Sequence, residues 1–117
     1  MVGEIIAALR RGTIVRSFDI IELIEEESVQ FLRVEAEIVD GSVLHVRELL
    51  LPGRSKYSYH SQAPSGVVLA RWDNAPHHRK LPTHPDYKHT GSDVVASSRV
   101  SIDDVLAEIG MQLREQG

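Results

Sequence analysis

Apolar and polar residues alternate most regularly in the segment "QFLRVEAEIVDGSVLHVRELLL", residues 30–51. Alternation with a period of two is typical of a β-strand that buries one face. The two alternating runs flank Asp40-Gly41, and an Asp-Gly dipeptide strongly favours a tight turn between antiparallel strands. The sequence therefore predicts a β-hairpin at this place.

The side chains of this hairpin indicate how its two strands pair. A three-residue loop with Gly41 in the left-handed conformation would pair Ile38 with Leu44 on the apolar face. On the other face the same register sets Glu35 opposite Arg47, and opposite charges across strands are favourable. We expect this register. Its one defect is Glu48, which falls on the apolar face.

The flanking segments have the patterns of short elements separated by turns. Residues 3–12, "GEIIAALRRG", have the spacing of an amphipathic helix that Gly12 ends. Residues 13–28, 56–61 and 67–73 are rich in β-branched or aromatic residues, which favour strands. Short connections favour antiparallel neighbours, so we expect a β-meander of about five strands.

Residues 101–117 have the pattern of a second helix. Ser101 is the expected N-cap, with Asp104 three residues later as in a capping box. An apolar stripe recurs at helical spacing: Ile102, Leu106, Ile109 and Leu113. The expected fold class is α+β, a single antiparallel β-meander of about five strands with an N-terminal and a C-terminal helix packed on it. One domain over residues 1–117 is expected.

Composition and charge narrow the class of protein. The 117 residues are 42% apolar and 26% charged, as in ordinary globular domains. No apolar run approaches the roughly 20 residues that span a membrane, and the N-terminus lacks a signal-peptide pattern. The absence of cysteine excludes disulfides and thiolate metal sites. We expect a soluble cytoplasmic protein with no cofactor and no membrane partner.

The net charge of −4 hides an uneven distribution. Residues 1–50 carry ten acids and five bases, residues 51–100 three acids and seven bases, and residues 101–117 four acids and one base. A basic middle between acidic flanks favours an anionic partner at one place on the surface. The alternative is that the basic block pairs with its own acidic flanks.

Four of the six histidines lie in "RWDNAPHHRKLPTHPDYKH", residues 71–89. Its prolines, Pro76, Pro82 and Pro85, exclude a helix and argue against a central strand. Because each proline biases the preceding residue towards an extended conformation, a stiff loop can hold side chains in place. The alternative is an irregular solvated arm whose histidines are incidental.

Strand alternation sorts the polar residues near this segment by face. Arg71 and Asp73 share one face of their strand. Tyr57 and Tyr59 share a face of another strand, and His60 takes the opposite one. If these strands are neighbours, the tyrosines, Arg71 and the histidine-rich loop can converge at one edge of the sheet.

Three functions are compatible with these residue types. The first is a metal-dependent phosphodiesterase, in which imidazoles and a carboxylate from Asp73 or Asp86 would bind the ion. No histidine pair, however, has the i, i+4 helical spacing that would make this signal strong.

The second function is metal-free cleavage of RNA. In that reaction one histidine takes the 2′-OH proton, another protonates the leaving 5′-oxygen, and a cation binds the phosphate. The candidate ligands and cations are His77, His78, His84, His89, Arg71, Arg79 and Lys88.

The third function is binding without catalysis. The basic loop would then hold a nucleic acid or a protein, and Tyr57 and Tyr59 could stack on unpaired bases. The acidic run "ELIEEES", residues 22–28, could engage a basic partner. We favour a solvated strand edge for this run, because charges commonly protect such edges from pairing.

The motifs "YSYH" (57–60), "RWDNAPHH" (71–78) and "KHTG" (88–91) together resemble those of the TumE-type toxin family of prokaryotic toxin–antitoxin systems. The similarity covers most of the chain, and the Asp-Asn-Ala-Pro-His-His run is its most specific part. It implies a small toxin that acts on RNA and is neutralised by a cognate antitoxin, so both are expected partners. It leaves open whether the chain forms a homodimer.

From the resemblance together with these residue types we expect a metal-independent endoribonuclease site, in which His78 and His89 exchange protons with the 2′-OH and the leaving oxygen. Arg71 and Lys88 would hold the phosphate. Asp73 would orient a histidine or Arg71, and Tyr59 would stack or form a hydrogen bond. The residues expected to bind substrate are Tyr57, His60, His77, Arg79 and Asn74.

Two features qualify this transfer of roles. Many members of the family have Pro-His-His-Lys-His where this chain has Pro-Asp-Tyr-Lys-His at residues 85–89, which shifts the expected roles to Lys88 and His89. Asn74 has a structural alternative, because its side chain could close an Asx-turn before Pro76.

Overall fold

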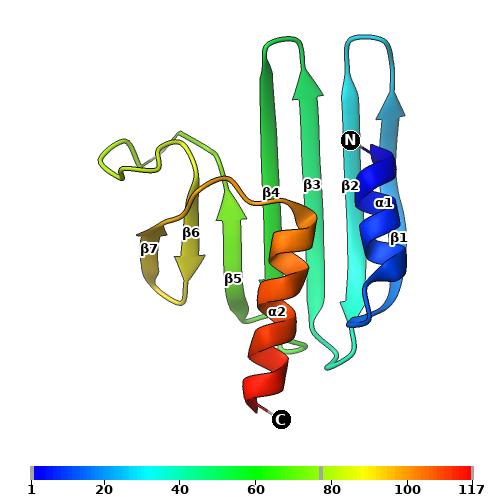
Figure 1. Ribbon diagram of the computed structural model, residues 1–117, viewed down its shortest axis with the longest axis vertical. Coiled ribbons are helices and arrows are strands. Elements are labelled where there is room, and N and C mark those ends of the chain that lie inside the picture. The colour runs from blue at the N-terminus through cyan, green and yellow to red at the C-terminus, as the bar shows by residue number, and fades with distance from the viewer. Residues whose placement is uncertain (1, 77, 117) are drawn as a thin grey trace.

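The computed structural model describes residues 2–76 and 78–116. These residues form two helices and one antiparallel sheet whose seven strands follow one another in chain order (Figure 1). The α+β meander is therefore confirmed, with seven strands rather than about five. The elements are α1 (Val2–Arg11), β1 (Val15–Glu25), β2 (Gln30–Ile38), β3 (Val43–Leu51), β4 (Arg54–Gln62), β5 (Val68–Asp73), β6 (Tyr87–Thr90), β7 (Asp93–Ala96) and α2 (Ile102–Gln116).

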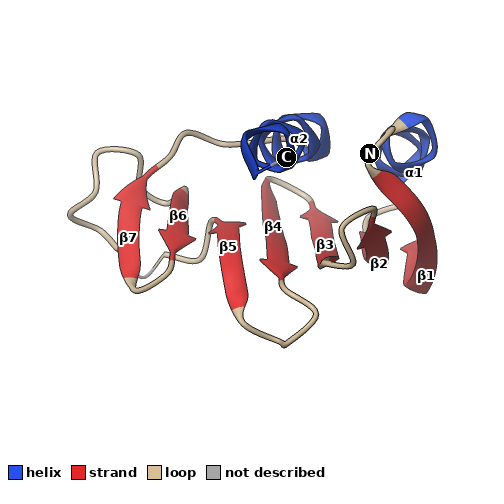
Figure 2. Cartoon of the chain, turned by 90° about the horizontal axis from the view of Figure 1, so that it is seen from below, coloured by secondary structure: helices blue, strands red, loops and turns tan. Residues whose placement is uncertain are grey.

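Both helices lie on one face of the sheet and build the core there (Figure 2). α1 covers β1 and β2, while α2 covers β3 and β4 (Figure 1). The capping box of α2 is present, since Ser101 N donates to Asp104 Oδ2 at 2.8 Å and Asp104 N donates to Ser101 Oγ at 3.2 Å. Neither described helix is long and apolar enough to cross a membrane. The expected stripe of α2 packs on the core through Ile102, Leu106, Ile109 and Leu113.

The strands that sequence patterns did not predict are β6 and β7. β6 pairs with β5 on one side and with β7 on the other. The expectation that residues 71–89 contain no central strand is therefore wrong, because residues 71–73 of β5 pair on both sides and so do residues 87–89 of β6. The three prolines all precede this strand, so its backbone N–H groups remain available for pairing. Gly91, with φ of +58°, adopts the left-handed conformation that reverses the chain between β6 and β7.

The hairpin of β2 and β3 is confirmed, but its predicted register is wrong by two residues. The structure pairs Ala36 with Leu44, where we expected Ile38 with Leu44. Asp40 explains the shift, because its Oδ1 accepts from both the N–H and the hydroxyl of Ser42, at 3.0 and 2.6 Å, and so closes the loop one residue earlier on each side. Gly41 is left-handed as expected, with φ of +89°. A shift of two preserves the face of every side chain.

Candidate functional site

The sheet face opposite the helices, which we call the open face, carries a row of histidines around one arginine. Along β2 to β6, Glu35, His45, His60, Arg71 and His89 are successive cross-strand partners. Partners in adjacent strands point to the same side, about 5 Å apart. These five side chains therefore form one line across the sheet, in which Arg71 lies between His60 and His89.

Arg71 is held in place by Asp73 on the same strand. Arg71 Nε donates to Asp73 Oδ2 at 2.9 Å, and the Asp73 side chain is only 4% exposed while that of Arg71 is 45% exposed. Asp73 Oδ1 also accepts from the Ala75 N–H at 3.0 Å. A buried carboxylate that accepts two hydrogen bonds thus fixes one edge of the guanidinium. The remaining N–H donors of Arg71 are free to bind a ligand. Asp73 thus contacts Arg71, one of the groups that we expected it to orient.

His78 joins this row from the loop between β5 and β6. Its ring packs against Tyr87, with centroids 4.6 Å apart, and lies 5.8 Å from the ring of His89. Tyr87 and His89 are 5.3 Å apart, which completes a cluster of three rings. Burial and the carboxylate of Asp73 raise the pKa of Tyr87 to about 12, so its hydroxyl stays protonated at neutral pH. The cluster therefore packs two imidazoles against an uncharged ring, and one of them, His89, is the cross-strand partner of Arg71.

His60 lies on the other side of Arg71 in the row. Burial lowers the pKa of His60, and the neighbouring Arg71 and His45 lower it further. Its Nε2 atom is buried without a hydrogen-bond partner among the described residues. The rings of His45 and His60 meet edge to face, with centroids 5.7 Å apart. A neutral His60 can therefore pack beside Arg71 without adding a second positive charge.

Two of the expected catalytic residues lie on the opposite, helix-covered face. Tyr59 is buried there, and its hydroxyl donates to Glu48 Oε2 at 2.8 Å. Lys88 forms an ion pair with Glu108 of α2, and its ammonium lies 5.0 Å from the centre of the Trp72 ring. The expected convergence of these side chains with Arg71 is wrong. Adjacent residues of a strand point to opposite faces, and the register sets Tyr59 and Lys88 beside Trp72.

Tyr57 and Asn74, which we expected to bind substrate, both form contacts within the protein. The hydroxyl of Tyr57 donates to Asp86 Oδ1 at 2.7 Å, and its buried ring packs between Tyr59 and Arg99. Asn74 accepts from the Tyr57 N–H and donates to the Ser55 carbonyl, so its amide continues the edge of the ladder beyond β5. The Asx-turn considered as the structural alternative for Asn74 is formed by Asp73.

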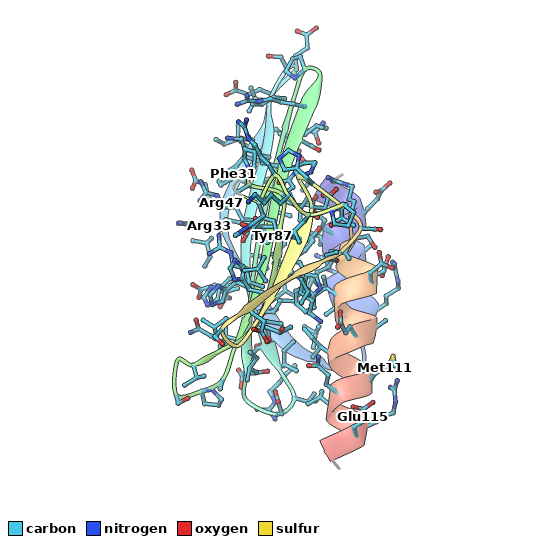
Figure 3. The ribbon with its side chains drawn as sticks, turned by 90° about the vertical axis from the view of Figure 1, so that its left-hand side faces the viewer. Phe31, Arg33, Arg47, Tyr87, Met111 and Glu115 are labelled. Atoms are coloured by element: carbon cyan, nitrogen blue, oxygen red, sulfur yellow. The ribbon has the colours of Figure 1, made fainter. Side chains whose placement is uncertain are left out.

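Two hollows of about 410 and 370 Å³ lie next to each other on the open face. They share Arg47, Ser58 and Arg71 in their linings. Figure 3 shows Arg47, together with Phe31 and Arg33, on the side of the sheet away from the helices. The row of histidines therefore borders a surface that is hollowed and carries arginines.

The other expected site residues contribute less to this arrangement. Arg79 and His84 are exposed on the loop before β6. His77 lies outside the described residues. Within residues 2–76 and 78–116, no three histidine or acidic side chains come close enough together to hold one metal ion. In the described part of the chain, the candidate ligands of the metal-dependent alternative therefore do not form a three-ligand cluster.

Three residues of the open face, His45, Arg47 and Tyr87, were not among the site residues expected from the sequence. His45 and Arg47 alternate with the apolar positions of the hairpin, and this signal was sufficient to place both on its polar face. Tyr87 could not be placed, because β6 was not expected.

The fold and the site define a small α+β protein with helices on one face of a meander and a cationic, histidine-bearing surface on the other. The model of one protein family, described as toxin TumE, matches residues 5–113. The chain belongs to the TumE toxin family, as its motifs implied. It is therefore a toxin, and the family implies an antitoxin as its protein partner. Comparisons with curated proteins and with solved structures found no significant match.

Proposed function

We propose that this toxin is a metal-independent endoribonuclease that binds the scissile phosphate of RNA on Arg71 and cleaves the RNA by histidine acid–base catalysis. One observation carries the proposal. An exposed arginine, oriented by a buried aspartate, is the cross-strand partner of His89, and the ring of His89 lies 5.8 Å from that of a second imidazole, His78. Cleavage of RNA by its own 2′-OH needs these groups, namely a base, an acid and a fixed cation for the phosphate.

In the proposed reaction the scissile phosphate lies on the guanidinium of Arg71. One of His78 and His89 takes the proton from the 2′-OH, whose oxygen attacks the phosphorus. The other imidazole gives a proton to the departing 5′-oxygen, so the products are a 2′,3′-cyclic phosphate and a free 5′-OH. Asp73 acts as a positioning residue for Arg71. Lys88 and Tyr59 have no part in this scheme, because they lie on the helix-covered face.

The first test is cleavage of single-stranded RNA by the purified protein, with and without EDTA, followed by analysis of the ends. We expect cleavage that survives EDTA and leaves 2′,3′-cyclic phosphate. His89→Ala and Arg71→Ala should each lower the rate by about 10²-fold or more and abolish toxicity at equal expression. His84→Ala is the matched control, because it removes an exposed histidine of the same loop that lies outside the ring cluster.

Other outcomes would contradict the proposal in different ways. Cleavage that is lost with EDTA would favour the metal-dependent phosphodiesterase. RNA binding that weakens with salt, without cleavage by the protein alone or with ribosomes, would favour the binding module. Full toxicity of both His89→Ala and Arg71→Ala would exclude the proposed site.

A further inference from the structure

The larger hollow of the open face, of about 410 Å³, extends from Arg71 along β3 and β4 away from the histidine row. Three cations line it, Arg47, Lys56 and Arg71. Among the described residues, the one acid in its lining is Asp73, which is already bound to Arg71. The hollow is thus a concave surface with an excess of positive charge.

Arg47 and Lys56 are not neutralised by their neighbours in the sheet. The cross-strand partners of Arg47 are Arg33 and Ser58, and that of Lys56 on β3 is Leu49. Neither cation forms an ion pair with any described residue, and the guanidinium of Arg47 packs over the ring of Phe31 at 5.5 Å. Two arginines directly opposite each other are unfavourable in a sheet. A bound anion would remove this repulsion.

Part of the lining of the same hollow is apolar. Leu49 lies beside Lys56 on the adjacent strand, and Ala75 and Pro76 border the hollow where the chain leaves β5. An apolar surface next to two cations fits a ligand that has a flat ring and a phosphate. The volume of the hollow also lies within the range of small-molecule sites, roughly 300–1,000 Å³.

We propose that this hollow is a nucleotide subsite that binds the unpaired nucleotide next to the one on Arg71, with its phosphate on Arg47 and Lys56 and its base on Leu49 and Pro76. Because Arg71 lines both the hollow and the histidine row, one strand of RNA can occupy the two together. The inference rests on the proposed function in one respect, which is that the ligand is RNA.

The test measures binding of a short 2′-O-methyl oligouridylate, which lacks the attacking 2′-OH and is not cleaved. Fluorescence anisotropy would give Kd over a range of salt concentrations for the full chain and for Arg47→Gln/Lys56→Gln. The matched control is Arg10→Gln/Arg114→Gln, which removes two exposed positive charges from the helices. We expect Kd to rise about tenfold or more in the first variant and the salt slope to fall by about 0.7, because one phosphate contact is lost. In the control variant, the changes in Kd and in the salt slope should each be less than half of these. Melting temperatures would verify that both variants are folded.

Three results would overturn the subsite. The first is equal binding by Arg47→Gln/Lys56→Gln and by the unmutated chain. The second is inorganic polyphosphate of equal charge binding as tightly as the oligonucleotide, which would exclude a contact with the base. The third is polyglutamate binding more tightly than the oligonucleotide, which would make the surface a site for an acidic protein.

The subsite and the proposed function can fail separately. Binding through Arg47 and Lys56 without cleavage of unmodified RNA would contradict the endoribonuclease and support the subsite. Cleavage of unmodified RNA by a protein whose oligonucleotide affinity ignores Arg47 and Lys56 would contradict the subsite and support the endoribonuclease.

Discussion

Removing the hydroxyl of Tyr59 should destabilise the protein more at neutral pH than in acid. Tyr59 donates a hydrogen bond of 2.8 Å to Glu48, a carboxylate buried on the helix-covered face. Burial raises the pKa of Glu48, and the hydrogen bond from Tyr59 and the charge of Arg99 partly offset this. In Tyr59→Phe the buried carboxylate loses its donor, and its pKa rises further.

The magnitude follows from the charge of the acceptor. A hydrogen bond to a charged group contributes about 1.5–3 kcal/mol, against about 1 kcal/mol for a neutral pair. We expect Tyr59→Phe to lower the free energy of unfolding by about 2 kcal/mol at pH 7 and by about 1 kcal/mol near pH 4. For a domain of this size, this corresponds to about 8 and about 4 °C in Tm.

The direction of the pH effect follows from proton linkage. Because the pKa of Glu48 is raised in the folded state, the folded protein binds its proton more tightly than the unfolded chain does. The stability that this group adds is complete below its unfolded pKa and is lost as the pH rises through its folded pKa. A further rise of that pKa in Tyr59→Phe therefore costs most at neutral pH, where the carboxyl must be charged or take up a proton.

Urea denaturation of both proteins at the two pH values is the measurement. In a Glu48→Gln background the cost of Tyr59→Phe should become independent of pH, because the acceptor no longer titrates. Tyr57→Phe serves as a second control, since it removes a tyrosine hydroxyl whose acceptor, Asp86, is only partly buried. Equal losses at pH 7 and near pH 4, or a loss below about 0.5 kcal/mol at pH 7, would refute the reasoning.

Three further predictions concern single residues. Lys88→Ala should lower the free energy of unfolding by about 1 kcal/mol in denaturation experiments, because Lys88 contacts Glu108 and Trp72. RNA cleavage should stay unchanged, and a loss of cleavage without a loss of stability would contradict the position of Lys88 on the helix-covered face. Asp73→Asn should lower the kcat of the proposed cleavage about tenfold or more with little change in KM, because Arg71 loses its orienting carboxylate; a variant with altered Tm and unaltered kcat would argue against a positioning role. Gly41→Ala should cost about 1 kcal/mol, measured by thermal melting, because φ is +89° there; an unchanged Tm would show that the loop tolerates a β-carbon.

Local patterns were sufficient for the elements whose determinants are local. The alternation in residues 30–51 and the Asp40-Gly41 turn predicted the hairpin, and Ser101 with Asp104 predicted the start of α2. The period of side chains along a strand or helix depends only on the backbone of that element, so one segment of sequence contains it. For the same reason the division of Tyr57 and His60 between two faces was correct.

Strand count and register depended on contacts that sequence patterns do not contain. β6 is four residues long and too short for a periodic signal, and it is a strand because β5 and β7 flank it. The register of the hairpin depended on a side-chain contact between Asp40 and Ser42. An alternating pattern cannot distinguish two registers that differ by two residues, because both keep every side chain on the same face.

The sequence by itself determined the family, the fold class and the residue types of the candidate site. Only the tertiary structure decided which of those residues meet. Lys88 and His89 are adjacent in sequence, yet one contacts α2 and the other lies beside Arg71. The faces of different strands become common faces only through pairing, and pairing is a long-range contact. That physical reason separates His60 and His89, which lie on the open face, from Tyr59 and Lys88, which belong to the same two motifs but lie on the helix-covered face.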